Sequence, residues 1–247
     1  MILLLDLGNT ALKWSVSHKH GLSQHGWIEH SDLRVTELEA LWKALPRPDC
    51  VAIASVGSSS AYEQIEGLVY KLWKTDLLRV QTCAEHGGVR NAYPACNDLG
   101  VDRWAAMIAA RDMLTAAFCV IDCGTAITID MVAADGQHQG GVIFPGLAMM
   151  QDSLLSKTHL PVDKVAKIGR LAMADNTSDA VANGACYACV AAIDRILQEY
   201  VQGTDEEVSC VITGGDSDRI RSLLQKTCLH DPDLVLKGME VILRGMQ

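Results

Sequence analysis

Two segments of this 247-residue chain follow the same local pattern, and this repeat restricts the folds open to the chain more than any other feature. Residues 2–17 predict a strand, a tight turn and a second strand, with Asp6-Leu7-Gly8-Asn9-Thr10 at the turn. Residues 118–132 predict the same arrangement, with Asp122-Cys123-Gly124-Thr125 at the turn. We interpret the two segments as an internal repeat in which an Asp-x-Gly turn joins neighbouring strands.

The rest of the chain alternates predicted helices with predicted strands. From hydrophobic periodicity we expect helices at residues 36–45, 61–73, 102–114, 147–156 and 177–200, and strands at 50–56, 77–81, 140–146 and 208–213. Thr36 and Glu39 have the spacing of a capping box at the start of the first helix. The alternation indicates an α/β fold whose sheets are covered by helices. A division near residue 115 gives two halves, residues 1–115 and residues 116–247.

The acidic balance of the chain limits its partners. With 21 Lys+Arg against 30 Asp+Glu, the net charge is −9, whereas a protein that binds nucleic-acid backbones needs a basic face, so we expect no nucleic-acid partner. The longest segment without a charged residue, Gly136–Gln151, carries Gly, Gln, His and Pro, so we expect no membrane span. No basic segment opens the N-terminus, and we therefore expect a cytoplasmic protein without a signal peptide.

The chain has nine cysteines, an odd number that cannot all pair in disulfides, and we expect reduced thiols. Cys186 and Cys189 form a C-x-x-C in an Ala-rich predicted helix, and no second ligand pair for zinc is evident. We expect both side chains to be buried as small apolar groups.

Three strand ends combine glycine with an acid or a hydroxyl, as phosphate-binding loops do. In the first loop Gly8 leaves room for a phosphate, Thr10 and backbone N–H groups can donate to its oxygens, and Lys13 adds positive charge. Asp6 is suited to hold hydrated Mg²⁺. The alternative is a hairpin turn with an ordinary surface aspartate. The second and third loops are Asp122–Thr125 and Gly214-Gly215-Asp216, and the chain has neither a P-loop signature nor a dinucleotide-binding G-x-G-x-x-G after a strand.

A fourth motif, Gly100-Val101-Asp102-Arg103-Trp104, stands at the start of a predicted helix. In the first helical turn the macrodipole favours the ionised form of Asp102, which can accept a proton or orient a hydroxyl. Arg103 can bind a carboxylate or a phosphate in bidentate fashion. The alternative is an ordinary helix N-terminus beside a solvated arginine.

Together these motifs resemble those of the type III pantothenate kinases, in the superfamily that contains acetate kinase, sugar kinases and actin. The resemblance runs nearly end to end, through Asp6–Lys13, Asn91–Pro94, Gly100–Trp104, Ile121–Thr128, Gly140–Gly146, Asn176-Thr177 and Thr213–Asp216. It implies an actin-like ATPase fold with two similar ribonuclease H-like halves and a central cleft. Residues 1–115 would carry the first phosphate loop and the catalytic aspartate, and residues 116–247 the second phosphate loop and the adenosine loop.

The resemblance also implies a reaction, transfer of the γ-phosphoryl group of ATP to pantothenate by a homodimer, which yields 4′-phosphopantothenate in the first step of coenzyme A biosynthesis. Asp102 matches the catalytic base, and Asp122 matches a ligand of a monovalent cation, K⁺ or NH₄⁺. The positions that match ATP-binding residues are Asp6, which would hold Mg²⁺ through water, Leu7, Gly8, Asn9, Thr10, Ala11, Leu12, Lys13 and Thr125, with Gly214 and Gly215 near the adenosine. The positions that match the pantothenate pocket are Tyr93, Gly100, Val101, Asp102, Arg103 and Thr177.

Two alternatives remain open at the level of sequence. One is a kinase or phosphatase of the same fold that acts on another small molecule, such as a sugar, because fold alone does not fix the substrate. The other is a nucleotide-binding transcriptional accessory protein, against which the acidic charge and the set of Asp6, Lys13 and Asp102 both argue.

We also expect Cys123 to make the second loop sensitive to oxidation.

Overall fold

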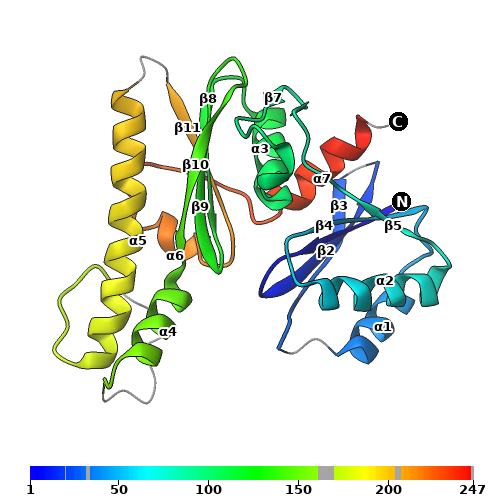
Figure 1. The fold of residues 1–247 in the computed structure, drawn as a ribbon, viewed down its shortest axis with the longest axis horizontal. Helices are drawn as coiled ribbons and strands as arrows, with labels where there is room; N and C mark the ends of the chain where they lie inside the picture. Colours follow the sequence, from blue (N-terminus) through cyan, green and yellow to red (C-terminus); the bar gives the residue numbers. More distant parts are fainter. Residues whose placement is uncertain (20, 32–33, 161–169, 204–206, 246–247) are drawn as a thin grey trace. The chain divides into compact units, whose positions relative to one another are not determined.

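The computed structural model describes residues 1–19, 21–31, 34–160, 170–203 and 207–245. The chain forms two compact units, the first of Met1–Met113 with Asp233–Gln247 and the second of Leu114–Pro232 (Figure 1). The division predicted near residue 115 lies close to the boundary at Met113, but the C-terminal segment belongs to the first unit rather than the second. The reason is tertiary packing, since the C-terminal helix lies against a helix of the first unit.

The first unit is built on a five-stranded mixed sheet with the strand order β3-β2-β1-β4-β5. Its strands are β1 (Ile2–Leu7), β2 (Ala11–His18), β3 (Gly21–Glu29), β4 (Cys50–Ser55) and β5 (Leu77–Arg79). The β1–β2 and β2–β3 pairs are antiparallel, whereas the β1–β4 and β4–β5 pairs are parallel. A short sheet of β6 (Glu85–His86) and β7 (Val89–Arg90) and the 3₁₀ helix η1 (Cys96–Asp98) follow.

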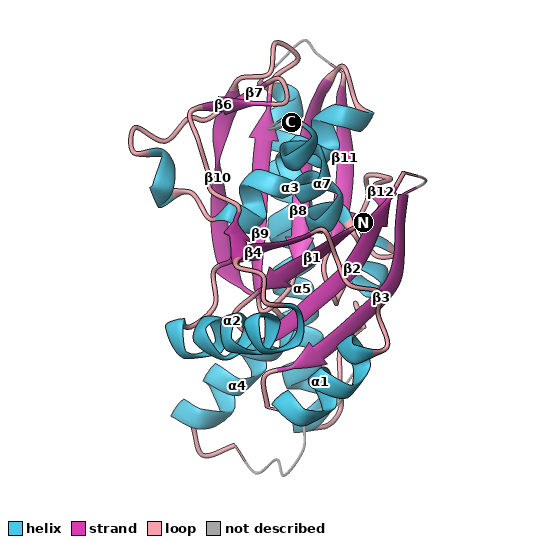
Figure 2. Ribbon diagram, turned by 90° about the vertical axis from the view of Figure 1, so that its right-hand side faces the viewer, coloured by secondary structure: helices cyan, strands magenta, loops and turns pink. Residues whose placement is uncertain are grey.

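Helices cover both faces of this sheet, and the alternation of side chains along β1 decides what each face meets. Helices α1 (Val35–Lys43) and α2 (Ser59–Trp73) pack on the face that carries Leu3, Leu5 and Leu7 (Figure 2). Because successive strand residues point to opposite faces, Asp6 lies on the other face. There α3 (Val101–Met113) and α7 (Leu234–Arg244) pack side by side, with α7 against β1.

A cluster of three tryptophans fills the core between the sheet and the helices α1 and α2. The rings of Trp14 and Trp42 meet edge to face with centroids 6.1 Å apart, and those of Trp42 and Trp73 stack at 6.0 Å. These geometries are favourable for aromatic pairs and add to the burial of the rings. All five tryptophans of the chain, at positions 14, 27, 42, 73 and 104, belong to the first unit.

The second unit repeats the topology of the first. Its strands β8 (Ala117–Cys123), β9 (Ala126–Val132), β10 (His138–Pro145), β11 (Val208–Thr213) and β12 (Leu229–His230) form a sheet of order β10-β9-β8-β11-β12. The β8–β9 and β9–β10 pairs are antiparallel, and the β8–β11 and β11–β12 pairs are parallel, as in the first unit. The repeat seen in the sequence is therefore confirmed, as two sheets of one topology.

One face of the second sheet is covered by α5 (Thr177–Gln202), with α4 (Leu147–Lys157) and α6 (Ser217–Arg221) beside it (Figure 1). Cys186 and Cys189 are both fully buried in this core, which confirms their packing role. Helix α5 is long and apolar enough for a membrane span, but half of its apolar stretch is buried within the protein, as in the core helix of a soluble protein.

The predicted helices and strands are confirmed, with ends that differ by two residues or fewer. The capping box is wrong, because α1 begins at Val35 and its N-cap is Arg34, so Thr36 already lies inside the helix. Glu39 instead binds Lys43 and Lys71, each at 2.7 Å. The edge strand β3, most of whose residues are half-buried, was not predicted.

Candidate functional site

The first loop is the turn of the β1–β2 hairpin, as the sequence predicts. Asp6 and Lys13 are cross-strand partners, so their side chains lie opposite each other on one face of the sheet. Asp6 is 8% exposed. The Gly8 N–H donates to the Ala11 carbonyl at 3.0 Å. Asn9 and Thr10 are exposed at the tip. A carboxylate and an ammonium group thus stand together at the base of an exposed polar turn.

Two residues that sequence reasoning missed hold this turn in place. The His30 Nε2–H donates to the Gly8 carbonyl at 2.9 Å, and the His30 backbone N–H donates to the Thr10 carbonyl at 2.7 Å. The Gly57 N–H donates to the Leu7 carbonyl at 3.0 Å. A Cβ on Gly57 would lie 2.6 Å from the Gly8 carbonyl oxygen, so the close approach requires glycine here. The one sequence feature that could have indicated Gly57 is its position two residues after the buried strand β4.

The second and third loops come together at one edge of the second sheet. The strands β8 and β11 are parallel neighbours with Asp122 opposite Thr213, and the Asp216 N–H donates to the Cys123 carbonyl at 2.9 Å. Gly214 has a φ of 95°, and a Cβ there would lie 2.5 Å from Asp122 Oδ1. Glycine is therefore needed twice over, for its backbone conformation and for the space beside the Asp122 carboxylate.

The two hairpins differ in one charge. Where Asp6 faces Lys13 across its strand pair, Asp122 faces Thr128. The first turn spans four residues between Leu7 and Leu12, and the second spans three between Cys123 and Ile127. The repeated architecture thus carries a fixed cation in the first hairpin and a hydroxyl in the second. Thr125 is exposed at the tip of the second turn.

Cys123 points away from the loop. Its side chain is fully buried in the core of the second unit. Burial raises the pKa of the Cys123 thiol far above its ordinary value, and the charges of Asp122 and Asp216 raise that pKa further. Because the thiolate is the reactive form, the structure does not support the expected sensitivity to oxidation. Alternation along β8 decides this, since it turns Cys123 toward the core and Asp122 to the opposite face.

Asp102 stands in the first turn of α3, where the sequence predicts it. Its Oδ1 accepts the backbone N–H of Arg103 at 2.8 Å. A Cβ on Gly100 would lie 2.5 Å from this same oxygen, so the carboxylate occupies space that only glycine leaves open. Behind it, the Leu99 carbonyl accepts the Thr82 hydroxyl at 3.0 Å. The motif therefore fixes the position of a carboxylate at the positive end of a helix dipole.

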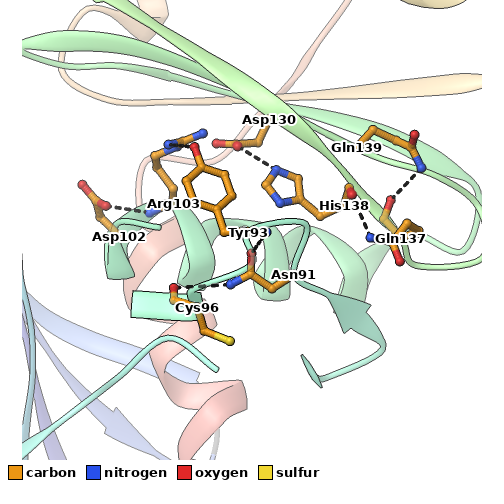
Figure 3. A network of polar contacts seen from close by, with 9 residues as sticks. All are labelled: Asn91, Tyr93, Cys96, Asp102, Arg103, Asp130, Gln137, His138 and Gln139. Atoms are coloured by element: carbon orange, nitrogen blue, oxygen red, sulfur yellow. Dashed lines mark hydrogen bonds and ion pairs between the residues drawn. The ribbon is translucent and has the colours of Figure 1, made fainter. Parts of the chain in front are cut away.

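Arg103 and Tyr93 form a second part of the same site (Figure 3). Arg103 is 7% exposed, and its Nη1 donates to the Tyr93 hydroxyl at 3.2 Å, with the guanidinium 5.8 Å from the ring centroid. Asn91 sets the position of Tyr93, because its Oδ1 accepts the Tyr93 N–H at 2.9 Å and its Nδ2 donates to the Cys83 carbonyl at 3.3 Å. The first unit thus brings Tyr93, Gly100, Val101, Asp102 and Arg103 into one structural element and its flanking loop.

Thr177 lies in the second unit, at the first position of α5. The N-cap is Asn176, whose Oδ1 accepts the Asp179 N–H at 2.9 Å. This cap explains why Asn176 and Thr177 occur together, since asparagine is among the preferred N-cap residues. The exposed polar end of α5 is therefore well defined by the sequence.

No group of three or more His, Cys, Asp or Glu side chains suited to a metal ion occurs in the part of the chain that the structure describes. One buried acid–imidazole pair lies on β9 and β10, where Asp130 and His138 are each 1% exposed and 3.0 Å apart (Figure 3). A cation that also binds substrate oxygens, as Mg²⁺ does, needs only one or two of the carboxylates present.

Comparison with known sequences shows one family along the whole chain. A sequence model described as type III pantothenate kinase matches residues 2–199. The type III pantothenate kinase of Nitrosococcus oceani is 36% identical over 245 residues, which cover 97% of this chain and 92% of the relative. That of Alcanivorax borkumensis is 34% identical over 252 residues, with both chains fully covered.

Comparison with solved structures shows the fold. A Campylobacter jejuni protein assigned to the Baf family of transcriptional activators has a TM-score of 0.61 at 18% identity, over 99% of this chain and 98% of that one. MreB 5 of Spiroplasma citri bound to AMPPNP has a TM-score of 0.51 at 12% identity, over 99% and 96%. These likenesses and the repeated sheets confirm the actin-like ATPase fold with two similar halves.

Proposed function

This chain belongs to the type III pantothenate kinase family and is an ATP-dependent kinase of pantothenate in coenzyme A biosynthesis, and we propose which residues carry each part of that reaction. The observation that carries the assignment is the Asp102 carboxylate, held against Gly100 at the start of α3 with Arg103 and Tyr93 beside it. Phosphoryl transfer depends on positioning and charge neutralisation more than on covalent chemistry, and each proposed role below is of one of these kinds.

The first hairpin binds the phosphates of ATP in this proposal. The residues are Asp6, Leu7, Gly8, Asn9, Thr10, Ala11, Leu12 and Lys13, with Thr125 of the second hairpin as a further phosphate contact. The exposed turn supports this role, because its hydroxyl and amide groups are open to a ligand while His30 and Gly57 fix its backbone. Lys13 would neutralise phosphate charge at the base of the turn.

Two cations complete the neutralisation. Asp6 fits Mg²⁺, held through water, because its buried carboxylate supplies the oxygen ligand that Mg²⁺ prefers beside phosphates. When bound, Mg²⁺ supplies charge that stabilises the phosphates as they separate. Asp122 fits a monovalent cation, K⁺ or NH₄⁺, because a carboxylate faces Thr128 there instead of a lysine and Gly214 leaves space beside Oδ1.

Asp102 acts on the acceptor in this proposal. Its carboxylate orients the primary hydroxyl of pantothenate and takes the hydroxyl proton, while the hydroxyl oxygen forms its bond to the γ-phosphorus and ADP leaves. Tyr93, Gly100, Val101, Arg103 and Thr177 line the pantothenate site. Pantothenate carries a carboxylate and amides, for which the Arg103 guanidinium and the Tyr93 hydroxyl are suitable partners.

The Asp102→Asn variant tests this assignment. The amide keeps the size of the side chain but cannot take a proton, so we expect turnover with pantothenate to fall about 10²- to 10⁴-fold while ATP binding is retained. Asp98→Asn, at an exposed aspartate four residues earlier, is the matched control and should keep wild-type turnover. Turnover of Asp102→Asn within a few-fold of wild type in a coupled ADP assay would overturn the general-base role.

Gly214 and Gly215 lie near the adenosine in this proposal, and Gly215→Leu tests it. Gly215 is exposed, and a Cβ there would meet no atom within 4 Å, so the variant should fold normally. The added side chain would occupy the space proposed for the nucleoside. We expect a raised KM for ATP with the KM for pantothenate unchanged, and an unchanged KM for ATP would overturn the placement.

We also propose a cytoplasmic homodimer. The edge strand β10 supports the dimer, because it exposes Val142 and Ile143, of which Ile143 is 61% exposed. Light scattering after size-exclusion chromatography should give twice the mass of 26.7 kDa. A monomeric mass at assay concentrations would contradict the dimer without affecting the assigned reaction.

A further inference from the structure

Behind the Gly214 loop lies a chain of two hydrogen bonds that none of the roles above uses. The Ser217 hydroxyl donates to the Gly214 carbonyl at 2.5 Å. The same hydroxyl oxygen lies 2.9 Å from Nε2 of His230. Ser217 begins the short helix α6, and His230 ends β12, so the contact joins two elements that flank the loop.

The position of one proton follows from these contacts. A serine hydroxyl has a single hydrogen, and here that hydrogen goes to the Gly214 carbonyl, which can only accept. The bond between Ser217 and His230 must then use a hydrogen on His230 Nε2. The histidine therefore donates to the serine, and the serine donates to the glycine carbonyl.

We call the two hydrogen bonds, from His230 to Ser217 and from Ser217 to the Gly214 carbonyl, the relay. The relay differs from ordinary surface contacts because its central group is buried. Ser217 is 2% exposed, so its hydroxyl would lose its partners without replacement by bulk water if either bond were removed. The other ring nitrogen of His230, Nδ1, lies 3.5 Å from the carboxylate of Asp218, whose side chain is 72% exposed. That outer contact is solvated, and Asp218 also pairs with Arg221 at 2.9 Å.

We propose that Ser217 and His230 are positioning residues that fix the Gly214 carbonyl and thereby hold the loop in the conformation that binds the nucleoside of ATP. The proposal rests on the assignment of Gly214 and Gly215 to the adenosine. Gly214 has a positive φ, a conformation that glycine enters and leaves easily. Two backbone bonds also hold the loop, from the Ser217 N–H to the Gly214 carbonyl at 3.2 Å and from the Asp216 N–H to the Cys123 carbonyl at 2.9 Å. The relay adds a side-chain contact that comes from β12, outside the loop itself.

The kinetic test compares Ser217→Ala, His230→Leu and His230→Gln. Losing the relay should raise the KM for ATP and the dissociation constant of AMPPNP about 3- to 10-fold, the range of one hydrogen bond, while kcat at saturating ATP and the KM for pantothenate stay unchanged. The glutamine side chain retains an N–H donor, so His230→Gln should recover much of the affinity. Arg221→Gln is the control, since it removes an exposed ion pair of α6 and leaves the relay intact.

Equal affinity for AMPPNP in wild type, Ser217→Ala and His230→Leu would overturn the proposal, as would a fall in kcat with no change in affinity. Gly215→Leu keeps this outcome distinct from failure of the adenosine assignment. If Gly215→Leu weakens ATP binding and the relay variants do not, only the relay is wrong. If Gly215→Leu has no effect, the adenosine assignment itself is wrong.

A measurement on the unaltered protein does not depend on any variant folding. Long-range ¹H–¹⁵N spectra of the ¹⁵N-labelled protein at pH 8 distinguish a protonated from an unprotonated ring nitrogen, and loss of the signal in His230→Gln identifies the residue. We expect a hydrogen on His230 Nε2. A ring with its hydrogen on Nδ1 alone would overturn the relay, because the Ser217 hydroxyl would then have to donate to His230 instead of Gly214.

Discussion

Because Gly100 has no Cβ, it leaves room for the observed position of the Asp102 carboxylate. A methyl group at this position would lie 2.5 Å from Oδ1 of Asp102, the oxygen that accepts the Arg103 N–H. In Gly100→Ala the carboxylate must rotate away, and only the end of a flexible side chain has to move. We expect kcat to fall about 10-fold or more, within the usual contribution of a general base, with little loss of stability.

The measurement for Gly100→Ala is kcat beside the melting temperature. Ile108→Val is a suitable comparison, because Ile108 is fully buried in the same helix and its truncation alters packing without touching the carboxylate. A Gly100→Ala enzyme with wild-type kcat would mean that the observed position of Asp102 has no part in turnover.

The C-x-x-C cysteines should be inert in the folded protein. Burial raises the pKa of Cys189 to about 11, so only about one thiol in 10³ is ionised at pH 8. Iodoacetamide at pH 8 should therefore leave the Cys186–Cys189 peptide unmodified in native protein and label it after denaturation. Mass spectrometry of the digested protein reports both states. Rapid labelling of this peptide in native protein would contradict the burial of the pair.

At the residue scale, the sequence predicted the groups that carry charge better than the groups that hold them. Asp6, Lys13 and Asp102 follow from local spacing, because each sits at a strand or helix end that periodicity locates. His30 and Gly57 contact the first turn only because β1 pairs with β4 and the chain returns after β3. Such contacts arise from strand pairing, which local pattern does not specify.

At the scale of elements, the backbones of α7 and α3 come into direct contact where the two helices cross. A Cβ on Gly238 of α7 would overlap the Ala105 carbonyl of α3. In Gly238→Leu the backbones must move apart, and overpacking of this kind costs about 1–3 kcal/mol. We expect a clear fall in the melting temperature of the first unit.

Gly67→Ala is the control for the helix-crossing variant. Gly67 lies on the exposed side of α2 with open space beside it, so alanine there should stabilise the helix by up to about 1 kcal/mol. A Gly238→Leu protein as stable as Gly67→Ala would show that the close crossing is not needed for folding.

Two elements that sequence reasoning missed, β3 and α7, differ in the strength of their local signals. The strand β3 runs Gly21–Glu29 along the sheet edge, and its residues, most of them half-buried, show no clear alternation of apolar and polar side chains. Helix α7 has a strong apolar side, but its sequence cannot say which sheet that side will cover. For α1 the sequence located the helix, and a start one residue earlier removed Thr36 from the capping position.

At the scale of the whole molecule, the two units repeat one sheet topology but divide their charges differently. The first hairpin carries Lys13 opposite Asp6, whereas the second has Thr128 opposite Asp122. If Asp122 binds a monovalent cation, Thr128→Lys should supply the missing charge from the neighbouring strand. We expect this variant to retain activity in buffers free of K⁺ and NH₄⁺, where the wild type loses it.

Steady-state rates measured with and without added KCl check this substitution. Thr128→Gln has a similar reach without the charge and should keep the dependence on the monovalent cation. If Thr128→Lys needs KCl as much as the wild type does, then Asp122 is not where the cation acts.

The tryptophan cluster gives the molecule an intrinsic optical label. Because all five tryptophans belong to the first unit, fluorescence excited at the red edge of protein absorption comes from that unit alone, and it follows the packing around Trp14, Trp42 and Trp73. Circular dichroism, in contrast, follows both units, and the long helix α5 contributes strongly to it. Recording both signals during one denaturant titration therefore separates the two halves of the kinase without attaching a dye.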